Sequence, residues 1–263
     1  MIDLHCHILP GIDDGPGTMA ESLSLARAAV ADGTRTVVAT PHVSERFQNS
    51  GDGIHALVAV LEEALAADSV ELTIRAGAEV AMTVAVGLPD ETLAELTLGG
   101  GGWLLLEPPF VIVSPVLEAV VADVIDRGFR VVVAHPERCP AFLRDRRPLE
   151  RMVTAGAATA VTAGALDGRF GREPRRFALR LAADGLMHCV TSDAHDDQRR
   201  PPTMGAELER AGLGHLAGWL TDAVPGAILA GSELPPAPPE PDNQSVRRSR
   251  LRLRGHAVRR PGA

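Results

Sequence analysis

Short apolar runs alternate along the chain with segments in which apolar residues recur at helical spacing. Seven runs have the length and composition of buried strands: 2–4, 36–40, 71–78, 103–106, 130–134, 159–162 and 187–190. Helices are predicted between and after them, at about 19–31, 54–67, 90–97, 114–127, 140–155, 173–184, 203–212 and 215–230. The first helix has a start signal, because Thr18 is a suitable N-cap and Glu21 follows three positions later.

This alternation of strand and helix predicts a parallel sheet covered by helices. The simplest closed form is a (β/α) barrel, although an open doubly wound sheet uses the same alternation. Side chains that bind metals stand at the carboxyl ends of nearly all the predicted strands: His5, His7, His42, Glu79, Glu107, His135, Asp193 and His195. These ends meet at one mouth in a barrel but are spread along an edge in an open sheet, so the pattern favours the barrel.

The opening stretch brings several of these groups together. His5 and His7 are two residues apart at a strand end, so both point to the same face while Cys6 points away. Asp13 and Asp14 then offer carboxylates on a turn. Each residue alone has an ordinary explanation, since a loop histidine is usually on the surface and an acid after a strand often caps the next helix. Their joint placement at strand ends is what indicates a metal site.

Composition narrows the chemistry further. The chain has 263 residues, 45% of them hydrophobic, which suffices for one α/β barrel. All 26 basic residues are arginine, which excludes a lysine Schiff base and the lysine-dependent phosphate-binding loop. Cysteine-based tyrosine phosphatases need C-x(5)-R, and none of the three cysteines has arginine at the sixth position after it. The scattered cysteines, and the lack of a leader or a long apolar run, predict a cytoplasmic protein.

Charge is distributed unevenly along the chain. The net charge is −8, but residues 235–263 contain seven arginines and two acids, so this segment carries +5 and the remainder −13. We expect a folded domain over 1–234 and a Pro-rich, then Arg-rich disordered tail over 235–263. The tail is either solvated without a specific partner or contacts anionic lipid or nucleic acid. The acidic body argues against a specific nucleic-acid function.

Several motifs together resemble a known family. They are I-D-L-H-C-H-I-L-P-G-I-D-D-G-P at 2–16, A-T-P-H at 39–42, G-A-E-V at 77–80, L-L-E-P-P at 105–109, A-H-P-E-R at 134–138 and T-S-D-A-H at 191–195, followed by R-P-P at 200–202. The sequence resembles the polymerase and histidinol phosphatase (PHP) superfamily, and within it the bacterial capsule-type manganese-dependent protein-tyrosine phosphatases. The resemblance covers about residues 1–230, and the opening motif is its most specific part.

The resemblance implies a distorted (β/α)₇ TIM-like barrel of the PHP type that holds three divalent ions. On that basis Glu79 bridges two of the ions, and Asp13 is an alternative to Asp14. The implied ligands are His5, His7, Glu79 and Asp193 for the first ion, Glu79, Glu107 and His135 for the second, and Asp14, His42 and His195 for the third. The mixed nitrogen and oxygen set suits Mn²⁺, with Zn²⁺, Fe²⁺, Co²⁺ or Mg²⁺ as alternatives.

The implied reaction is hydrolysis of phosphotyrosine on a bacterial protein by a metal-activated hydroxide. Arg138 and Arg200 are expected to hold the phosphoryl oxygens, although Arg200 adjoins another arginine and an ordinary surface position is its alternative. His42 or a metal-bound water is expected to protonate the leaving group if a proton is needed.

The expected partner is a bacterial tyrosine kinase that controls capsule or exopolysaccharide synthesis. The alternatives are a small-molecule phosphatase acting on histidinol phosphate or a sugar phosphate, and a metal-binding regulatory module that has lost catalysis. The oligomeric state stays open.

Overall fold

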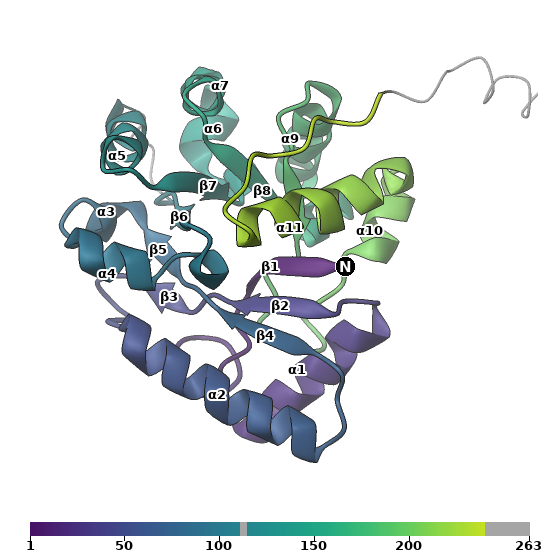
Figure 1. Ribbon diagram of the computed structural model, residues 1–263. Helices are drawn as coiled ribbons and strands as arrows, with labels where there is room; N and C mark the ends of the chain where they lie inside the picture. The colour runs from purple at the N-terminus through teal and green to yellow at the C-terminus, as the bar shows by residue number, and fades with distance from the viewer. Residues whose placement is uncertain (111–114, 240–263) are drawn as a thin grey trace, which may run out of the picture.

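The computed structural model describes residues 1–110 and 115–239, in which two parallel sheets are surrounded by helices (Figure 1). The strands are β1 (Ile2–Cys6), β2 (Thr36–Ala39), β3 (His42–Val43), β4 (Thr73–Ala76), β5 (Glu79–Ala81), β6 (Trp103–Glu107), β7 (Arg130–Ala134), β8 (Ala158–Thr162) and β9 (Cys189–Thr191). One sheet has the order β1-β2-β4 and the other β3-β5-β6-β7-β8-β9.

Two of the seven predicted strands are interrupted near their carboxyl ends. Thr40 and Pro41 separate β2 from β3, and residues 77–78 separate β4 from β5. The N–H of Glu79 donates to the carbonyl of Pro41 (3.1 Å), so the pairing continues from one sheet to the other. Nine short strands therefore correspond to seven barrel strands within the described residues.

The barrel closes between β1 and the residues that follow β9. A parallel bridge joins Cys6 to Ala194, and the N–H of His7 donates to the carbonyl of Ala194 (2.9 Å). The N–H of Asp193 donates to the carbonyl of His5 (2.9 Å). These contacts exclude the open sheet and confirm the predicted seven-stranded α/β barrel.

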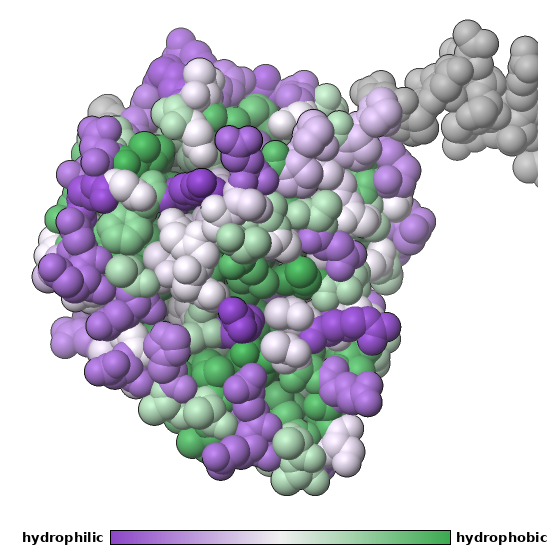
Figure 2. Space-filling view, viewed as in Figure 1, coloured by the Kyte–Doolittle hydropathy of each residue, from purple (hydrophilic) through white to green (hydrophobic). Residues whose placement is uncertain are grey.

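Helices cover the outside of the strands (Figure 1). The α-helices are α1 (Met19–Ala31), α2 (Gly51–Ala67), α3 (Met82–Ala85), α4 (Asp90–Glu95), α5 (Pro115–Asp126), α6 (Pro140–Arg144), α7 (Arg147–Thr154), α8 (Ala163–Leu166), α9 (Arg172–Ala183), α10 (Gly205–Arg210) and α11 (Val224–Leu229). Shorter turns are η1 (Leu98–Gly100), η2 (Pro136–Arg138), η3 (Gly214–Leu216) and the π-helical η4 (Trp219–Ala223). Hydrophilic side chains cover much of the helical surface, and hydrophobic patches lie between them (Figure 2).

The helix boundaries follow local chemistry. The predicted capping box at Thr18 and Glu21 is present and starts α1. The single helix predicted over 140–155 is wrong, because the chain forms α6 and α7 with an extended residue, Asp145, between them. Pro148 lies in the first turn of α7. Proline has no N–H to donate, so it starts a helix well but does not continue one.

A small apolar cluster fills one face of the strands and contacts α11. It contains Leu105 from β6, Val132 from β7 and Ala160 from β8, together with Val224 and Ile228 of α11. Glu107 is two residues beyond Leu105, so its side chain shares this face at the carboxyl end of β6. Glu107 therefore extends from the same face of β6 that packs this cluster.

Near its C-terminus the described chain remains packed on the barrel. The indole N–H of Trp219 donates to the carbonyl of Pro235 (3.1 Å). The boundary predicted at residue 234 stays a prediction, and the Arg-rich stretch lies outside the described residues. No helix of the described chain has the length and apolar character needed to cross a membrane.

Candidate metal centre

The side chains singled out at the strand ends come together at one place. Four groups of three or four have ligand atoms within 4.8 Å of one another. These groups are His7, Asp14, His42 and His195; His5, His7 and Asp193; His5, Glu79 and His135; and His42, Glu79 and Glu107. All nine predicted ligands are included, and several belong to more than one group, so the cluster is continuous.

The two histidines of the opening motif form the innermost part of the cluster. Their Nε2 atoms are 3.2 Å apart, and both rings are fully buried. Oε2 of Glu79 lies 3.3 Å from Nε2 of His5 and 3.4 Å from Nε2 of His7. Oδ1 of Asp193 lies 3.4 and 3.6 Å from the same two nitrogens. Cys6 packs in the apolar core instead, as the strand alternation predicts.

The carboxylate of Glu79 is shared between two further histidines. Its Oε1 accepts from Nε2 of His135 (2.8 Å), and its Oε2 lies 2.9 Å from Nδ1 of His42. The two oxygens of Glu107 are each 3.8 Å from one of these nitrogens. Glu79 thus stands at the centre, and the less buried Glu107 stands at the rim.

The sequence leaves open whether Asp13 or Asp14 is the metal ligand, and the structure places the two side chains differently. Oδ1 of Asp14 lies 3.4 Å from Nε2 of His42 and 3.3 Å from Nε2 of His195, so Asp14 belongs to the outer part of the cluster. Asp13 lies behind the cluster, where its Oδ2 accepts from Nδ1 of His7 (2.6 Å) and from the N–H of His42 (3.1 Å). This contact directs the Nε2 lone pair of His7 towards the cluster.

Glycine is required immediately after these aspartates. A Cβ atom at Gly15 would lie 2.4 Å from the carbonyl oxygen of His7. The Gly15 N–H donates to Oδ1 of Asp13 (2.9 Å), which completes the turn. The Asp-Asp-Gly sequence is therefore needed for one carboxylate to face inward and the other to support His7.

Asp193 connects the histidine cluster to two arginines. While its Oδ1 faces His5 and His7, its Oδ2 accepts from Arg138 (2.5 Å) and from Arg200 (2.6 Å). Its backbone has a positive φ of 50°, a conformation that non-glycine residues rarely adopt and that is concentrated at functional sites. The side chain of Arg200 is thus anchored on Asp193 and is 27% exposed.

Sequence reasoning missed Asp3, which supports the loop that carries Asp193. Asp3 is buried, and it accepts from the N–H (3.0 Å) and the hydroxyl (2.5 Å) of Ser192. Its place in the first strand, before the two histidines, was the available signal. Burial raises the pKa of Asp3 to about 6, against the lowering by the Ser192 hydrogen bonds.

The pKa shifts of the cluster show that positive charge is strongly favoured there. Burial opposes the charged form of His7, but hydrogen bonds to Asp13 and Glu79 outweigh it and raise its pKa to about 9. The same competition between burial and contacts with Asp14 and Glu79 raises the pKa of His42 to about 11. For Glu107, burial and then the charge of Glu79 raise the pKa to about 7. Protons and divalent cations compete for such a site.

The donor set fits divalent metal ions. Oε2 of Glu79 is buried and has no hydrogen-bond partner among the described residues, although three imidazole nitrogens surround it. The facing Nε2 atoms of His5 and His7 cannot both be protonated at 3.2 Å without repulsion. Imidazole and carboxylate together suit Mn²⁺, Zn²⁺, Fe²⁺ or Co²⁺.

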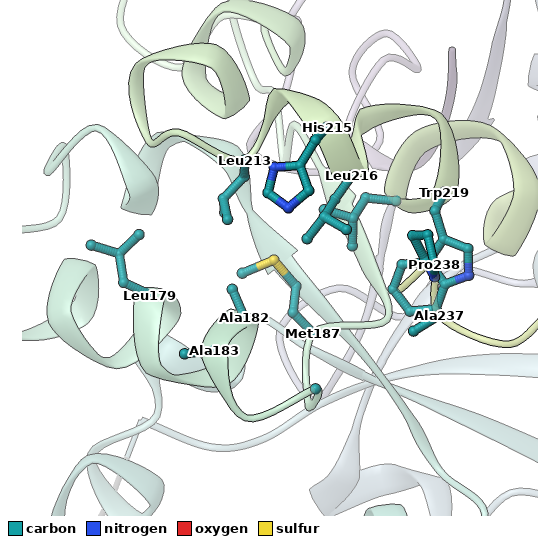
Figure 3. A pocket seen from close by; sticks show the side chains of 12 residues that line it. Leu179, Ala182, Ala183, Met187, Leu213, His215, Leu216, Trp219, Ala237 and Pro238 are labelled. Carbon is teal, nitrogen blue, oxygen red and sulfur yellow. The ribbon is translucent and has the colours of Figure 1, made fainter. Parts of the chain in front are cut away.

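A separate pocket has a different character. Its volume is about 390 Å³, and it is lined mainly by apolar residues of α9 and of the segment from Leu213 to Leu220 (Figure 3). His215 is the one ionisable side chain in its lining. Met187, which also lines it, precedes β9, whereas Asp193 follows that strand. The pocket is therefore at the opposite end of β9 from the metal cluster.

A family model described as capsular polysaccharide synthesis, CpsB/CapC, matches residues 1–211. The chain belongs to this family. Among similar proteins, the tyrosine-protein phosphatase YwqE of Bacillus subtilis is 37% identical over 204 residues, which cover 76% of this chain and 79% of YwqE. The tyrosine-protein phosphatase CpsB of Streptococcus pneumoniae is 27% identical over 210 residues, which cover 78% of this chain and 86% of CpsB.

Solved structures agree with the family assignment. One comes from work on YwqE of Bacillus subtilis and CpsB of Streptococcus pneumoniae, described as metal-dependent tyrosine phosphatases. It has a TM-score of 0.80 and 32% identity, and the match covers 92% of this chain and 99% of that one. Dihydropyrimidinase from Brevibacillus agri matches with a TM-score of 0.53 at 14% identity, covering 88% of this chain and 70% of that one, which shows a shared fold alone.

Proposed function

We propose that this protein is a metal-dependent tyrosine-protein phosphatase of capsular or exopolysaccharide synthesis. The observation that carries the proposal is the buried cluster of histidines and carboxylates, linked through Asp193 to Arg138 and Arg200. It is supported by membership of the CpsB/CapC family and by relatives that are named tyrosine-protein phosphatases. Three buried free cysteines are consistent with a cytoplasmic location, where thiols stay reduced.

Three divalent ions, most simply Mn²⁺, would be held by overlapping ligand sets. Glu79 bridges the first two sets, and His42 lies near enough to Glu79, Glu107 and Asp14 to serve either the second set or the third. The proposed sets, as the family resemblance implies them, are His5, His7, Glu79 and Asp193; Glu79, Glu107 and His135; and Asp14, His42 and His195. The structure supports them by overlap, since it groups His135 with His5 and Glu79, and His42 with both Glu107 and Asp14. Bound ions would lower the pKa of a water molecule and neutralise charge on the phosphoryl group.

The two arginines would bind the phosphoryl oxygens of the substrate. Both are held in place by the same carboxylate oxygen of Asp193, so little conformational freedom is lost when the substrate arrives. Nε of Arg200 is buried and has no hydrogen-bond partner in the described part of the chain, so it is a free donor beside the cluster. Guanidinium groups suit phosphate because their N–H groups are arranged as a planar fork.

Protonation of the leaving group is a smaller requirement. A phenolate is a stable leaving group, so no dedicated acid is needed. His42 is the candidate proton donor, and it would donate from a ring nitrogen that does not bind a metal, since one nitrogen cannot hold both.

The proposed partner is a phosphotyrosine protein, most simply a bacterial tyrosine kinase that controls the same pathway. The acidic body, with a charge of −13 over residues 1–234, argues against a nucleic-acid substrate. A tail that contacts anionic surfaces, and self-association, stay predictions for the full chain.

The test combines elemental analysis with activity. The purified protein should contain Mn²⁺ or a similar ion and hydrolyse a phosphotyrosine peptide, lose both on chelation, and recover both when metal is restored. His135→Ala should lose turnover by about 100-fold or more while it stays folded, whereas His55→Ala on the exposed face of α2 should match the parent.

Substrate comparison separates the alternatives. Fast turnover of histidinol phosphate or a sugar phosphate with poor turnover of peptides would replace the proposal with a small-molecule phosphatase. A metal-loaded protein inactive on every phosphomonoester would indicate a regulatory module.

A further inference from the structure

Three of the six phenylalanines of this chain lie around the metal cluster, although the chain is poor in aromatic residues. The ring of Phe47 stacks on His42, with centroids 5.6 Å apart and planes at 11°. The ring of Phe110 stacks on His135, with centroids 5.8 Å apart and planes at 19°. Each phenyl ring is therefore beside one of the two imidazoles that flank Glu79.

Phe110 is open to the solvent, unlike most large apolar residues of the chain. It is 50% exposed, and among the residues that the structure describes it is the one aromatic side chain of the exposed large hydrophobic residues. Phe47 is less exposed than Phe110. A ring that lies against a buried candidate ligand and still presents half its surface to the solvent can receive part of a substrate.

The backbone holds both rings at the strand ends. Phe110 directly follows Pro108 and Pro109 at the end of β6, where proline restricts the backbone. Phe47 closes a turn in which its N–H donates to the hydroxyl of Ser44 (3.2 Å) and its carbonyl accepts from the N–H of Ser44 (2.9 Å).

Arg138 connects the exposed ring to the phosphoryl position. Its guanidinium lies over Phe110 at 5.3 Å and over Phe170 at 4.5 Å from the ring centroids, while it also donates to Asp193. A phosphoryl group held by Arg138 would place the esterified carbon next to Phe110. A phenyl ester would bring its own ring into contact with Phe110, whereas an alkyl ester would leave the face of Phe110 exposed to water.

We propose that Phe110 is a specificity-determining residue that binds the aromatic ring of the substrate and selects phenolic phosphate esters over alkyl esters. Phe47 stacks on His42 and Phe170 on Arg138, so these two act as positioning residues. The inference rests on the proposed phosphatase function and names the substrate group that this side of the site recognises. Paired aromatic rings gain both from apolar burial and from their preferred stacking geometry.

The test uses the full-length, metal-loaded protein with one aromatic and one alkyl ester. For Phe110→Ala, kcat/KM for a phosphotyrosine peptide should fall about tenfold or more, while kcat/KM for the matching phosphoserine peptide should change less than about twofold. Phe110→Leu keeps an apolar side chain without the ring and should give an intermediate, equally selective loss. Val60→Ala, at an equally exposed position on α2, is the matched control.

A binding measurement gives a readout independent of turnover. The Kd of phenylphosphonate, measured by calorimetry, should rise about tenfold in Phe110→Ala while that of methylphosphonate stays within about twofold. Equal losses for both ligands, or no loss for either, in both Phe110 variants with parental metal content would overturn the inference. A parent that hydrolyses neither ester would overturn the proposed function, and the inference with it.

Discussion

Asp13→Asn tests the assignment of Asp13 as a support for a metal ligand rather than a ligand itself. In the parent, the carboxylate of Asp13 accepts at the same time from Nδ1 of His7 and from the N–H groups of Gly15 and His42. Asparagine has one acceptor oxygen and one NH₂ donor. If the NH₂ group faces His7, the ring must accept at Nδ1 and carry its proton at Nε2, where a metal would bind. If it takes the place of Oδ1 instead, it meets the N–H of Gly15, which is itself a donor.

The expected effect is a loss of metal affinity. Replacing a partner that orients a metal-binding histidine typically weakens metal binding about 10–100-fold, equivalent to about 1.4–2.8 kcal/mol. The fold should survive, since Asn has nearly the size of Asp and the two backbone N–H groups belong to a partly buried loop.

The assay is competition between the protein and a chelator of known Mn²⁺ affinity, with unfolding temperature as a folding control. Asp14→Asn is the informative comparison, because Asp14 lies at the outer group with His42 and His195 and is 45% exposed. It should remove one ion and leave the inner ions in place. An Asp13→Asn variant that binds all its metal with parental affinity would refute the reasoning.

Three further predictions follow from other contacts. Arg138→Gln should lower kcat/KM for a phosphotyrosine peptide about 10–100-fold, because a charged hydrogen bond of about 1.5–3 kcal/mol is lost, and the metal content should stay unchanged. Arg147→Gln, at an exposed residue, is the control. Parental activity in Arg138→Gln would contradict the assignment. Adding Mn²⁺ at about 100 times its Kd to the metal-free protein should raise the free energy of unfolding by about 2.7 kcal/mol per site. Denaturant titration would measure this change, and an unchanged midpoint would contradict a metal site that exists only in the folded state. Burial lowers the pKa of His188, whose Nδ1 accepts from the N–H of Thr159 (3.2 Å), so the stability that this residue contributes is present above pH 6.5 and is lost as the pH falls through its folded pKa. Denaturant titrations of the parent and of His188→Asn should therefore converge towards acidic pH, and parallel profiles would exclude the effect.

The sequence predicts the barrel and the cluster because both depend on local periodicity. Apolar runs of strand length carry their polar ligands at their ends, and parallel strands bring those ends together. The shared direction of His5 and His7 could be predicted from the alternation of a strand alone, and the start of α1 from its capping residues alone. The breaks between β2 and β3, and between β4 and β5, were not predicted, because they arise where strand ends turn into the site.

Other features depend on contacts between residues distant in sequence. The separate tasks of Asp13 and Asp14 follow from the position of His7 and His195 in space. The pairing of Asp3 with Ser192 joins residues 189 positions apart, and no local pattern reports it. The stacking of Phe110 on His135 likewise appears only when β6 and β7 lie side by side.

The burial of the three cysteines has a consequence for cells under oxidative stress. Cys6, Cys139 and Cys189 are each at most 1% exposed, and burial raises the pKa of each thiol. Peroxide and electrophilic drugs attack accessible thiolates, and they silence enzymes whose nucleophile is a cysteine. This chain keeps its three thiols protonated inside the apolar core, although Cys6 lies between His5 and His7 and Cys139 follows Arg138. Dephosphorylation by this protein would therefore continue under conditions that switch thiol-based phosphatases off, and alkylating reagents would leave it working.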